Sequence, residues 1–283
     1  MNDMCHPPGL APESFAAQDY KSGTKPIWCP GCGDYTVLNA VTKALSIVGR
    51  PPHEVAVVSG IGCSSRIPAY TSCYGFHGVH GRALAAATGV KLARPELTVL
   101  CAGGDGDGYS IGGNHFLHAC RRNVDLTYIV MDNHVYGMTK GQPSPTTEPD
   151  WDSKLSPGGT GVRSFHPLVI ALAAGANFVA RAFSGDQNTT ADIIAAGIRH
   201  PGFSFIEILS PCVTFRPEQR DWKNMVHPAP VQPTGDAARA AKRIMTDDGF
   251  NIGVLYAGQR PPYSGMPVPA RRAVRELEAE FAL

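Results

Sequence analysis

The sequence lacks a surplus of charge of either sign, and it has no long apolar run. Its 25 lysine and arginine residues nearly balance 24 aspartate and glutamate residues, which leaves a formal net charge of +1. Without a basic surplus there is no electrostatic reason to expect nucleic acid or an anionic membrane as a partner. No apolar stretch reaches the length of a membrane-spanning helix. The start of the chain also lacks a basic segment followed by an apolar core, so we expect no secretory signal.

The cysteines are therefore not expected to form a disulfide framework. Eight cysteines occur among 283 residues, and disulfide frameworks are typical of exported proteins. We expect a cytoplasmic protein whose cysteines are free thiols or metal ligands. With 43% hydrophobic residues, the chain can bury the core of one large α/β domain or of two small ones.

Short apolar runs alternate with stretches of helical periodicity. The runs are residues 55–59, 97–102, 126–132, 177–183 and 203–210, and the helical patterns cover 34–48, 82–93, 111–122 and 190–200, with Asp34 as a candidate N-cap. Continuous apolar strands between helices predict an α/β fold with a doubly wound, mainly parallel sheet covered on both faces. Ligands bind such sheets at the carboxyl ends of the strands.

The composition divides the chain into three parts. Residues 1–25 are rich in proline and small residues and are expected to form an arm without a core of its own. Residues 26–230 hold the alternating pattern and form the predicted domain. Residues 231–283 are expected to add a helix and a strand, and their terminal helix either contacts a partner or is simply solvated.

Two acid and amide side chains follow neighbouring apolar runs. Asp105 lies in GGDGDGYS after the second run, and Asn133 lies in MDNHVYG after the third. Because adjacent parallel strands end at the same edge of a sheet, we expect the two side chains to lie close together. Their oxygens, with a backbone carbonyl just beyond Asn133, suit Mg²⁺ that also binds a diphosphate. The alternative is two ordinary turns that close strands.

Two cysteines in WCPGCGDY (28–35) admit more than one interpretation. Cys29 and Cys32 have the spacing of a thioredoxin-like redox site and equally that of half a metal site. No strand pattern precedes Trp28, and Pro26 interrupts the approach, which argues against the thioredoxin interpretation. Cys101 in an apolar run and Cys120 in a helical pattern are expected to be small buried hydrophobes.

Several motifs together resemble one family. They are WCPGCGDY, GIGCSSR, HGRALAAATG, GGDGDGYSIGGNH, RRNVDLTYIVMDNHVYGMTKGQPSPTT and SPC. The GDG motif followed by Asn133 resembles the thiamine-diphosphate-binding signature. From about residue 25 to about residue 230 the chain resembles the β subunit of the 2-oxoacid:ferredoxin oxidoreductases, and its MTKGQ loop is most similar to members that act on 2-oxoglutarate or on several 2-oxoacids. The resemblance implies a sheet of the thiamine-diphosphate-binding type, namely the half that binds the diphosphate.

The resemblance also implies a ligand set for one [4Fe–4S] cluster. The matching residues are Cys29, Cys32, Cys63 of GIGCSSR and Cys212 of SPC. Cys63 and Cys212 each follow an apolar run, which places both at carboxyl ends of strands, and four thiolates are the usual complement of such a cluster. A structural zinc site on the same cysteines is an alternative that the spacing leaves open, and Cys73 is a rival ligand.

The cofactor contacts implied by the family motifs are as follows. Ile61, Gly62, Cys63 and Ser64, and then His80, Gly81, Arg82 and Ala83, match two loops that contact thiamine diphosphate; Asp105, Asn133 and the carbonyl of Val135 match the magnesium ligands; Gly106, Asp107, Gly137 and Met138 lie beside the diphosphate. His80 and Lys140 are the candidate catalytic residues, and Lys140 is expected to meet a substrate carboxylate. The alternatives are that His80 is a histidine of a surface loop and that Lys140 is simply solvated.

The implied activity is oxidative decarboxylation of a 2-oxoacid. Coenzyme A accepts the acyl group and ferredoxin the electrons, and the reaction can also run in reverse. We expect 2-oxoglutarate as the substrate, with pyruvate, a branched-chain 2-oxoacid, or a non-redox thiamine-dependent decarboxylase with structural zinc as alternatives. The activating glutamate of thiamine enzymes lies on another domain, so the resemblance implies an α subunit, or a fused γ–α subunit, in an (αβ)₂ assembly.

Overall fold

The computed structural model describes residues 14–263, 265, 278 and 280. Eight strands in this part of the chain form one sheet in the order β2-β1-β3-β4-β6-β5-β8-β7. The strands are β1 (Val55–Ser59), β2 (Tyr74–His77), β3 (Thr98–Gly104), β4 (Thr127–Asp132), β5 (Phe178–Phe183), β6 (Ser204–Leu209), β7 (His227–Pro228) and β8 (Asn251–Ala257). Neighbouring strands are parallel except for the antiparallel pair of β5 and β8. The predicted runs correspond to β1, β3, β4, β5 and β6, which confirms the predicted fold.

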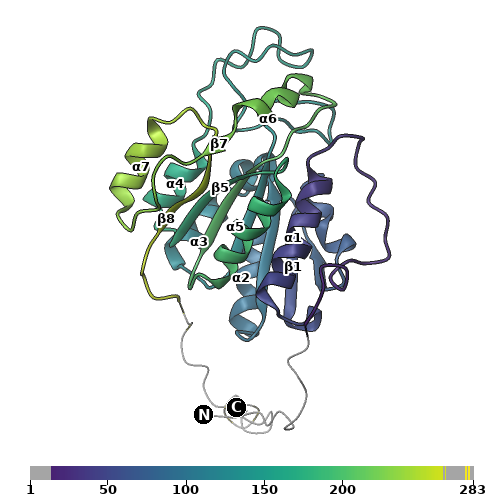
Figure 1. Cartoon of the computed structure of the whole chain (residues 1–283), viewed down its shortest axis with the longest axis vertical. Coiled ribbons are helices and arrows are strands. Elements are labelled where there is room, and N and C mark those ends of the chain that lie inside the picture. The colour runs from purple at the N-terminus through teal and green to yellow at the C-terminus, as the bar shows by residue number, and fades with distance from the viewer. Residues whose placement is uncertain (1–13, 264, 266–277, 279, 281–283) are drawn as a thin grey trace.

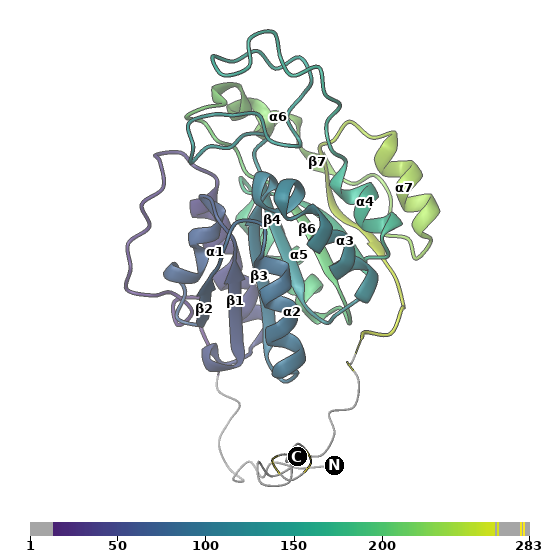
Figure 2. The ribbon, with the colours of Figure 1, turned by 180° about the vertical axis from the view of Figure 1, so that it is seen from behind.

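Helices cover both faces of the sheet, as predicted. They are α1 (Asp34–Val48), α2 (Ala83–Ala93), α3 (Gly113–Arg122), α4 (Pro167–Ala173), α5 (Gln187–Arg199), α6 (Trp222–Met225) and α7 (Ala237–Met245). Figure 1 shows α1 and α5 on one face, and Figure 2 shows α2, α3 and α4 on the other. In the described part of the chain, no helix is both long enough and apolar enough to cross a membrane.

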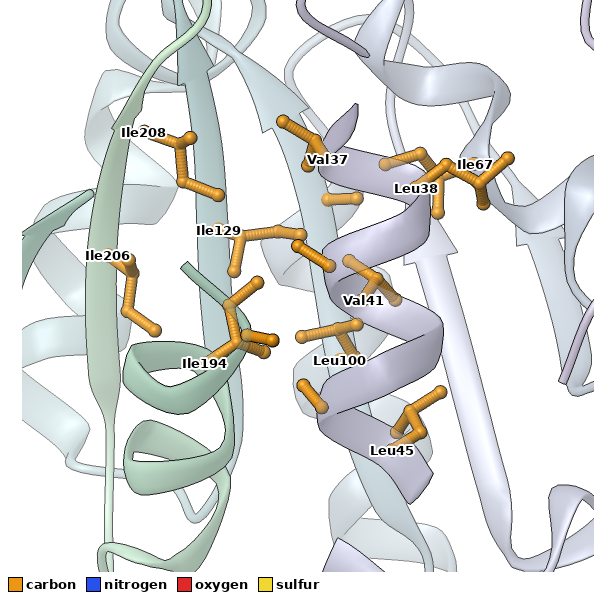
Figure 3. Packing of buried hydrophobic residues seen from close by; sticks show 14 of the residues in the cluster. Val37, Leu38, Val41, Leu45, Ile67, Leu100, Ile129, Ile194, Ile206 and Ile208 are labelled. Atoms are coloured by element: carbon orange, nitrogen blue, oxygen red, sulfur yellow. The ribbon is translucent and has the colours of Figure 1, made fainter. Parts of the chain in front are cut away.

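Successive residues of each buried strand point into different cores. Val57 of β1 belongs to the core beneath α1 and α5, and its neighbour Val58 belongs to the core on the opposite face. Figure 3 shows α1 side chains, among them Val41, packed toward Ile129 of the sheet. Full burial of one such aliphatic side chain contributes roughly 1.5–3 kcal/mol. Because both faces are covered, the ends of the strands are the part of the sheet that a ligand can reach.

Three local features differ from the expectations or refine them. Gly33, not Asp34, is the N-cap of α1, because the buried Asp34 carboxylate accepts a hydrogen bond from Ser210 Oγ at 2.9 Å instead. Strand β2 and helix α4 were not predicted. Within the arm, Tyr20 is fully buried and donates to the carbonyl of Arg50 at 2.6 Å, so this part of the arm packs on the domain.

The C-terminal segment extends the main sheet. Helix α7 and strand β8 are the predicted helix and strand, and β8 pairs directly with β5. The predicted partner contact of the tail concerns residues 271–283, which lie outside the described residues apart from positions 278 and 280. The proposed division at residues 25 and 230 stays a prediction.

Long connections gather at the carboxyl ends of the strands. In Figure 1 the segment between β4 and α4 and the segment that carries α6 lie together above the upper end of the sheet. Three short helices also lie in connections that leave β1, β3 and β6: η2 (Ser64–Tyr70), η3 (Gly106–Ile111) and η4 (Pro217–Asp221). These connections therefore lie at the edge of the sheet where ligands bind in this class of fold.

Candidate cofactor site

A cavity of about 510 Å³ lies where β1, β3 and β4 end. This volume is within the range of pockets that bind small molecules and cofactors. Most of the predicted cofactor residues line it, namely Ile61, Gly62, Cys63, Ser64, His80, Asp105, Gly106, Asp107, Asn133, Val135, Gly137 and Met138. The structure therefore brings together residues that are up to 77 positions apart, from Ile61 to Met138.

Other predicted residues lie outside this lining. Gly81 and Ala83 line a much smaller space together with Asp107, and the exposed Arg82 donates to the carbonyl of Ile111 at 3.4 Å. Lys140 is exposed and lines a second hollow of about 530 Å³. The structure thus does not bring Lys140 into the cavity, and its contact with a substrate carboxylate stays a prediction.

Asp105 and Asn133 lie close together, as the sequence predicted. Strand β3 pairs with β4, with Gly104 opposite Met131, and each strand ends just before one of the two residues. Both side chains line the cavity. Asn133 Oδ1 accepts a hydrogen bond from the main-chain N–H of Val135 at 3.1 Å, which turns the chain there. Both residues thus face one cavity, and the role of this pair as a magnesium site stays a prediction.

The carboxylate of Asp105 is held in a position that suits a cation. It is 3% exposed, and its Oδ2 accepts a hydrogen bond from Ser144 Oγ at 2.5 Å. Thr146 Oγ1 lies 3.1 Å from the same oxygen and 2.7 Å from Oδ1 of Asp132, so its one proton is shared between the two carboxylates. Burial, and secondly the neighbouring Asp132 carboxylate, raise the pKa of Asp105 to about 7. A bound divalent cation opposes both effects, so the residues present fit Mg²⁺. The two hydroxyl residues were missed, although they lie in the SPTT end of a motif quoted above.

Asp107 connects two loops that reach the cavity. Its Oδ1 accepts main-chain hydrogen bonds from Ile61 at 2.9 Å and Gly81 at 2.8 Å, and one from Nδ1 of His80 at 2.9 Å. Its Oδ2 is buried and has no hydrogen-bond partner among the described residues. A Cβ on Gly60 would lie 2.1 Å from that Oδ2, so glycine is required there. The predicted contact of Asp107 with a diphosphate remains untested.

Tyr136 is a cavity residue that the sequence did not identify. Its hydroxyl donates to the carbonyl of Gly106 at 3.1 Å. A Cβ on Gly106 would lie 2.2 Å from the Tyr136 ring, so this glycine permits the ring to pack against the turn after β3. The tyrosine lies in the HVYG motif beside Asn133, and that adjacency was the available signal.

The four cysteines named by the resemblance lie near one another. Burial, followed by the charges of Asp34, Cys212 and Cys29, raises the pKa of Cys63 to about 11. Burial and Asp34 also raise the pKa of Cys32, and there Cys63 and Cys212 add to the effect. The loops that carry these cysteines are also joined by hydrogen bonds. The thiols of Cys29, Cys32, Cys63 and Cys212 therefore form one group.

Hydrogen bonds fix the loops that carry these thiols. The main-chain N–H of Gly33 donates to the carbonyl of Pro211 at 3.2 Å, which joins the first cysteine loop to the last. The indole N–H of Trp28 donates to the carbonyl of Cys63 at 2.8 Å, which joins the first cysteine loop to the loop that carries Cys63. The tryptophan beside Cys29 thus holds the first cysteine loop against the second.

The remaining cysteines lie apart from this group. The pKa of Cys73 is raised to about 12 by burial alone, with no contribution from the other thiols, so the structure does not favour it as a rival ligand. Cys101 and Cys120 are fully buried, which confirms the expectation for both. Among the described residues, no three histidine, cysteine or acidic side chains converge on a single metal ion.

Comparisons with known proteins agree with this geometry. Residues 60–208 match the family described as thiamine pyrophosphate enzyme, C-terminal TPP binding domain. The chain is 46% identical over 198 residues to the 2-oxoglutarate oxidoreductase subunit KorB of Mycobacterium tuberculosis, which covers 70% of this chain and 53% of that protein. It is 37% identical over 290 residues to the 2-oxoacid:ferredoxin oxidoreductase 2 subunit beta of Aeropyrum pernix, covering 93% of each.

A solved structure is also similar over nearly the whole chain. It is a 2-oxoglutarate:ferredoxin oxidoreductase from Magnetococcus marinus with 2-oxoglutarate, coenzyme A and succinyl-CoA bound. The match has a TM-score of 0.85 and 38% sequence identity, and it covers 95% of this chain and 91% of the other. The chain spans about half of the M. tuberculosis relative and nearly all of the A. pernix one. The fold, the cavity and these similarities show that the chain has a thiamine-diphosphate-binding domain and belongs to the β-subunit family of the 2-oxoacid:ferredoxin oxidoreductases.

Proposed function

We propose that this chain is the thiamine-diphosphate-binding subunit of an enzyme that oxidatively decarboxylates 2-oxoglutarate to succinyl-CoA and passes the electrons to ferredoxin. The observation that carries the proposal is the contact between the group of four cysteines and the cavity. Cys63 lines the cavity, and a Cβ on Gly137, another lining residue, would lie 3.2 Å from Cys212 Sγ. Two of the four thiols thus lie at the wall of the proposed decarboxylation site, which suits removal of electrons from the cavity.

The diphosphate end of the cofactor is assigned to the turns after β3 and β4. Asp105, Asn133 and the carbonyl of Val135 would hold Mg²⁺, and main-chain groups beside Gly106 and Gly137 would approach the diphosphate. When bound, thiamine diphosphate supplies an electron sink for loss of CO₂. Of the two side chains that would hold the ion, Asp105 is buried and Asn133 is half-buried, and both are hydrogen-bonded.

His80 is the candidate for proton transfer or anion binding in the cavity. A carboxylate can only accept, so the hydrogen bond from Nδ1 to Asp107 places the ring proton on Nδ1. Nε2 is then the ring atom available to a ligand. The side chain is 38% exposed, so it can reach a substrate and still exchange protons with solvent. This is the orienting arrangement that general acid–base residues use.

The four cysteines would hold one [4Fe–4S] cluster between the cavity and the surface. When bound, such a cluster transfers electrons one at a time. Cys63 lies at the cavity, and Cys29 is exposed. The chain thus places one ligand toward the proposed electron source and another toward solvent, where a ferredoxin can dock. The same route serves the reverse, reductive direction.

A second subunit is needed to complete the site. No glutamate occurs among the described residues that line the cavity, whereas thiamine enzymes of the resembled family take an activating glutamate from another domain. We assign that group, together with much of the 2-oxoacid pocket and the coenzyme A site, to an α or fused γ–α subunit in an (αβ)₂ assembly. The substrate assignment is supported by the M. tuberculosis relative and by the M. marinus structure.

An anaerobic assay of the chain alone and of the chain with its partner tests the proposal. We expect the chain alone to be inactive, and the pair to reduce ferredoxin or a viologen only when both a 2-oxoacid and coenzyme A are present. The assay compares 2-oxoglutarate, pyruvate and 2-oxoisovalerate. Turnover by the chain alone contradicts the need for a second subunit, and a preference for pyruvate or 2-oxoisovalerate contradicts only the assigned substrate. Decarboxylation without electron transfer indicates the non-redox alternative.

A further inference from the structure

The side chain of Gln219 connects the two halves of the site. It lies in η4, it is 1% exposed, and its amide makes one hydrogen bond at each end. Nε2 donates to the main-chain carbonyl of Asn133 at 2.7 Å, and Oε1 accepts from the main-chain N–H of Cys212 at 2.9 Å. One buried amide thus bridges the loop assigned to magnesium and the loop assigned to the cluster.

Neighbouring contacts hold the same two loops together. Arg216 is 4% exposed and donates from Nη1 to the carbonyl of His134 at 3.1 Å. The thiol of Cys212 lies against Gly137, where an added Cβ would be 3.2 Å from Sγ. The segment 212–219 therefore contacts the loop 133–137 at two places: Gln219 meets Asn133, and Cys212 meets Gly137. These buried and directional contacts hold the two loops in one relative position.

The bridge requires an amide rather than another side chain of the same size. One end of Gln219 faces an acceptor and the other faces a donor, and a glutamine supplies the matching group at each end. An ionised glutamate keeps the acceptor for Cys212 but presents an oxygen to the carbonyl of Asn133. A methionine fills the same space and makes neither hydrogen bond. These two variants separate the two ends of the bridge.

We propose that Gln219 is a positioning residue that couples the two cofactor sites, so that binding of Mg²⁺ and thiamine diphosphate at the Asn133 loop shifts the reduction potential of the cluster held by Cys212. The inference rests on the proposed function. The potentials of iron–sulfur clusters respond to hydrogen bonds and charges around the ligand sulfurs. Because coupling between two sites is reciprocal, cluster reduction then changes the affinity for the cofactor by the same factor.

The test uses full-length wild-type protein, Gln219→Met and Gln219→Glu, all purified anaerobically. The cluster midpoint potential is measured by spectroelectrochemical titration with and without Mg²⁺ and thiamine diphosphate. Cofactor affinity is measured by calorimetry on oxidised and on reduced protein. In the wild type we expect the midpoint potential of the cluster to shift when Mg²⁺ and thiamine diphosphate bind. In Gln219→Met we expect that the cofactor affinity of the oxidised protein, divided by that of the reduced protein, falls toward one. In Gln219→Glu we expect about tenfold weaker cofactor binding with an unchanged cluster spectrum.

Gln232→Met, at an exposed position, is the matched control and should behave like wild type. A Gln219→Met protein that keeps the wild-type shift overturns the proposal, as does a wild type that binds both cofactors without any shift. If Gln219→Met fails to retain a cluster, Gln219→Glu decides, and wild-type affinity and shift in that variant overturn the proposal. A wild-type protein without iron or without cofactor binding contradicts the proposed function instead, so the two failures are distinguishable.

Discussion

The Oδ1 atom of Asp107 lies 2.9 Å from Nδ1 of His80. The same oxygen accepts the main-chain hydrogen bonds of Ile61 and Gly81. Hydrogen bonds to an ionised acceptor are shorter and stronger than those between neutral groups. One carboxylate therefore fixes the loops after β1 and β2 against the turn after β3, and it orients the histidine that faces the cavity.

Asp107→Asn keeps the size of the side chain and removes the charge that holds three donors. We expect about 10–100-fold weaker binding of Mg²⁺ and thiamine diphosphate, the range found for residues that orient ligands of a metal site. Calorimetry on anaerobic protein measures the affinity, and the visible spectrum should show an unchanged cluster. Asp192→Asn, at an exposed position on α5, is the control. Equal affinities in the two variants would contradict the assigned role.

The arrangement of the strands and the pairing of Asp105 with Asn133 followed from the sequence, because both rest on short-range patterns. Buried strands in a parallel sheet are continuous apolar runs, and β1 with the pattern VAVVS is such a run with all five residues buried. Adjacent carboxyl ends then follow from the order of the strands. Strand β2 was missed because its residues Tyr74–His77 are all exposed and form no apolar run.

The links within the site could not be predicted in the same way. Gln219 and Asn133 are 86 positions apart, and no periodic pattern relates a buried amide to the carbonyl it contacts. The positions of Ser144 and Thr146 around Asp105 were unpredictable for the same reason, because they depend on how the connection after β4 folds back over the sheet. The four cysteines were identified by resemblance, and the structure adds that their loops are joined by Trp28 and Gly33.

Asp105→Ala should abolish binding of thiamine diphosphate and leave the cluster in place. The substitution removes the one charged protein ligand proposed for Mg²⁺, and magnesium bridges the protein to the diphosphate. Ser144→Ala keeps the carboxylate but removes the 2.5 Å hydrogen bond that holds it, together with two longer contacts to the hydroxyls of Thr146 and Thr147, so we expect a partial loss of about tenfold. Titration calorimetry with Mg²⁺ and thiamine diphosphate checks both variants. Unchanged affinity in Asp105→Ala would refute the magnesium assignment.

Anaerobically purified wild-type protein should contain about four iron and four sulfide per chain, as one cubane requires. Cys63→Ala and Cys212→Ala each remove a proposed ligand from a different loop, and we expect both variants to lose the visible absorption of the cluster. Metal and sulfide analysis measures the content directly.

Cys73→Ala is the matched control for these two variants. Cys73 is also half-buried but has no electrostatic interaction with the other thiols, so its loss should leave the iron content unchanged. Zinc in place of iron in the wild type, or a full cluster in either ligand variant, would rule out the proposed set of four cysteines.

Lys140 lies at the tip of a tight loop beside the cavity. The main-chain N–H of Gly141 donates to the carbonyl of Tyr136 at 2.9 Å, and that of Tyr136 donates to the carbonyl of Gln142 at 2.8 Å. Thr139 and Gln142 of this loop line the cavity, whereas Lys140 lines the adjoining hollow together with Lys154. Both lysines thus carry a charge into one hollow, and only the first belongs to the loop that also forms the cavity wall.

If the ammonium group of Lys140 meets a substrate carboxylate, Lys140→Ala should raise the KM for 2-oxoglutarate about tenfold, the value of one charge-assisted hydrogen bond. The affinity for thiamine diphosphate should not change, because no cofactor contact is assigned to this side chain. Steady-state kinetics of the reconstituted pair measure the first quantity and calorimetry the second. Lys154→Ala removes an equal charge from the same hollow and should leave KM near the wild-type value. An equal rise in KM in both variants would show a general electrostatic effect of the hollow, and no rise in Lys140→Ala would show that this lysine is solvated.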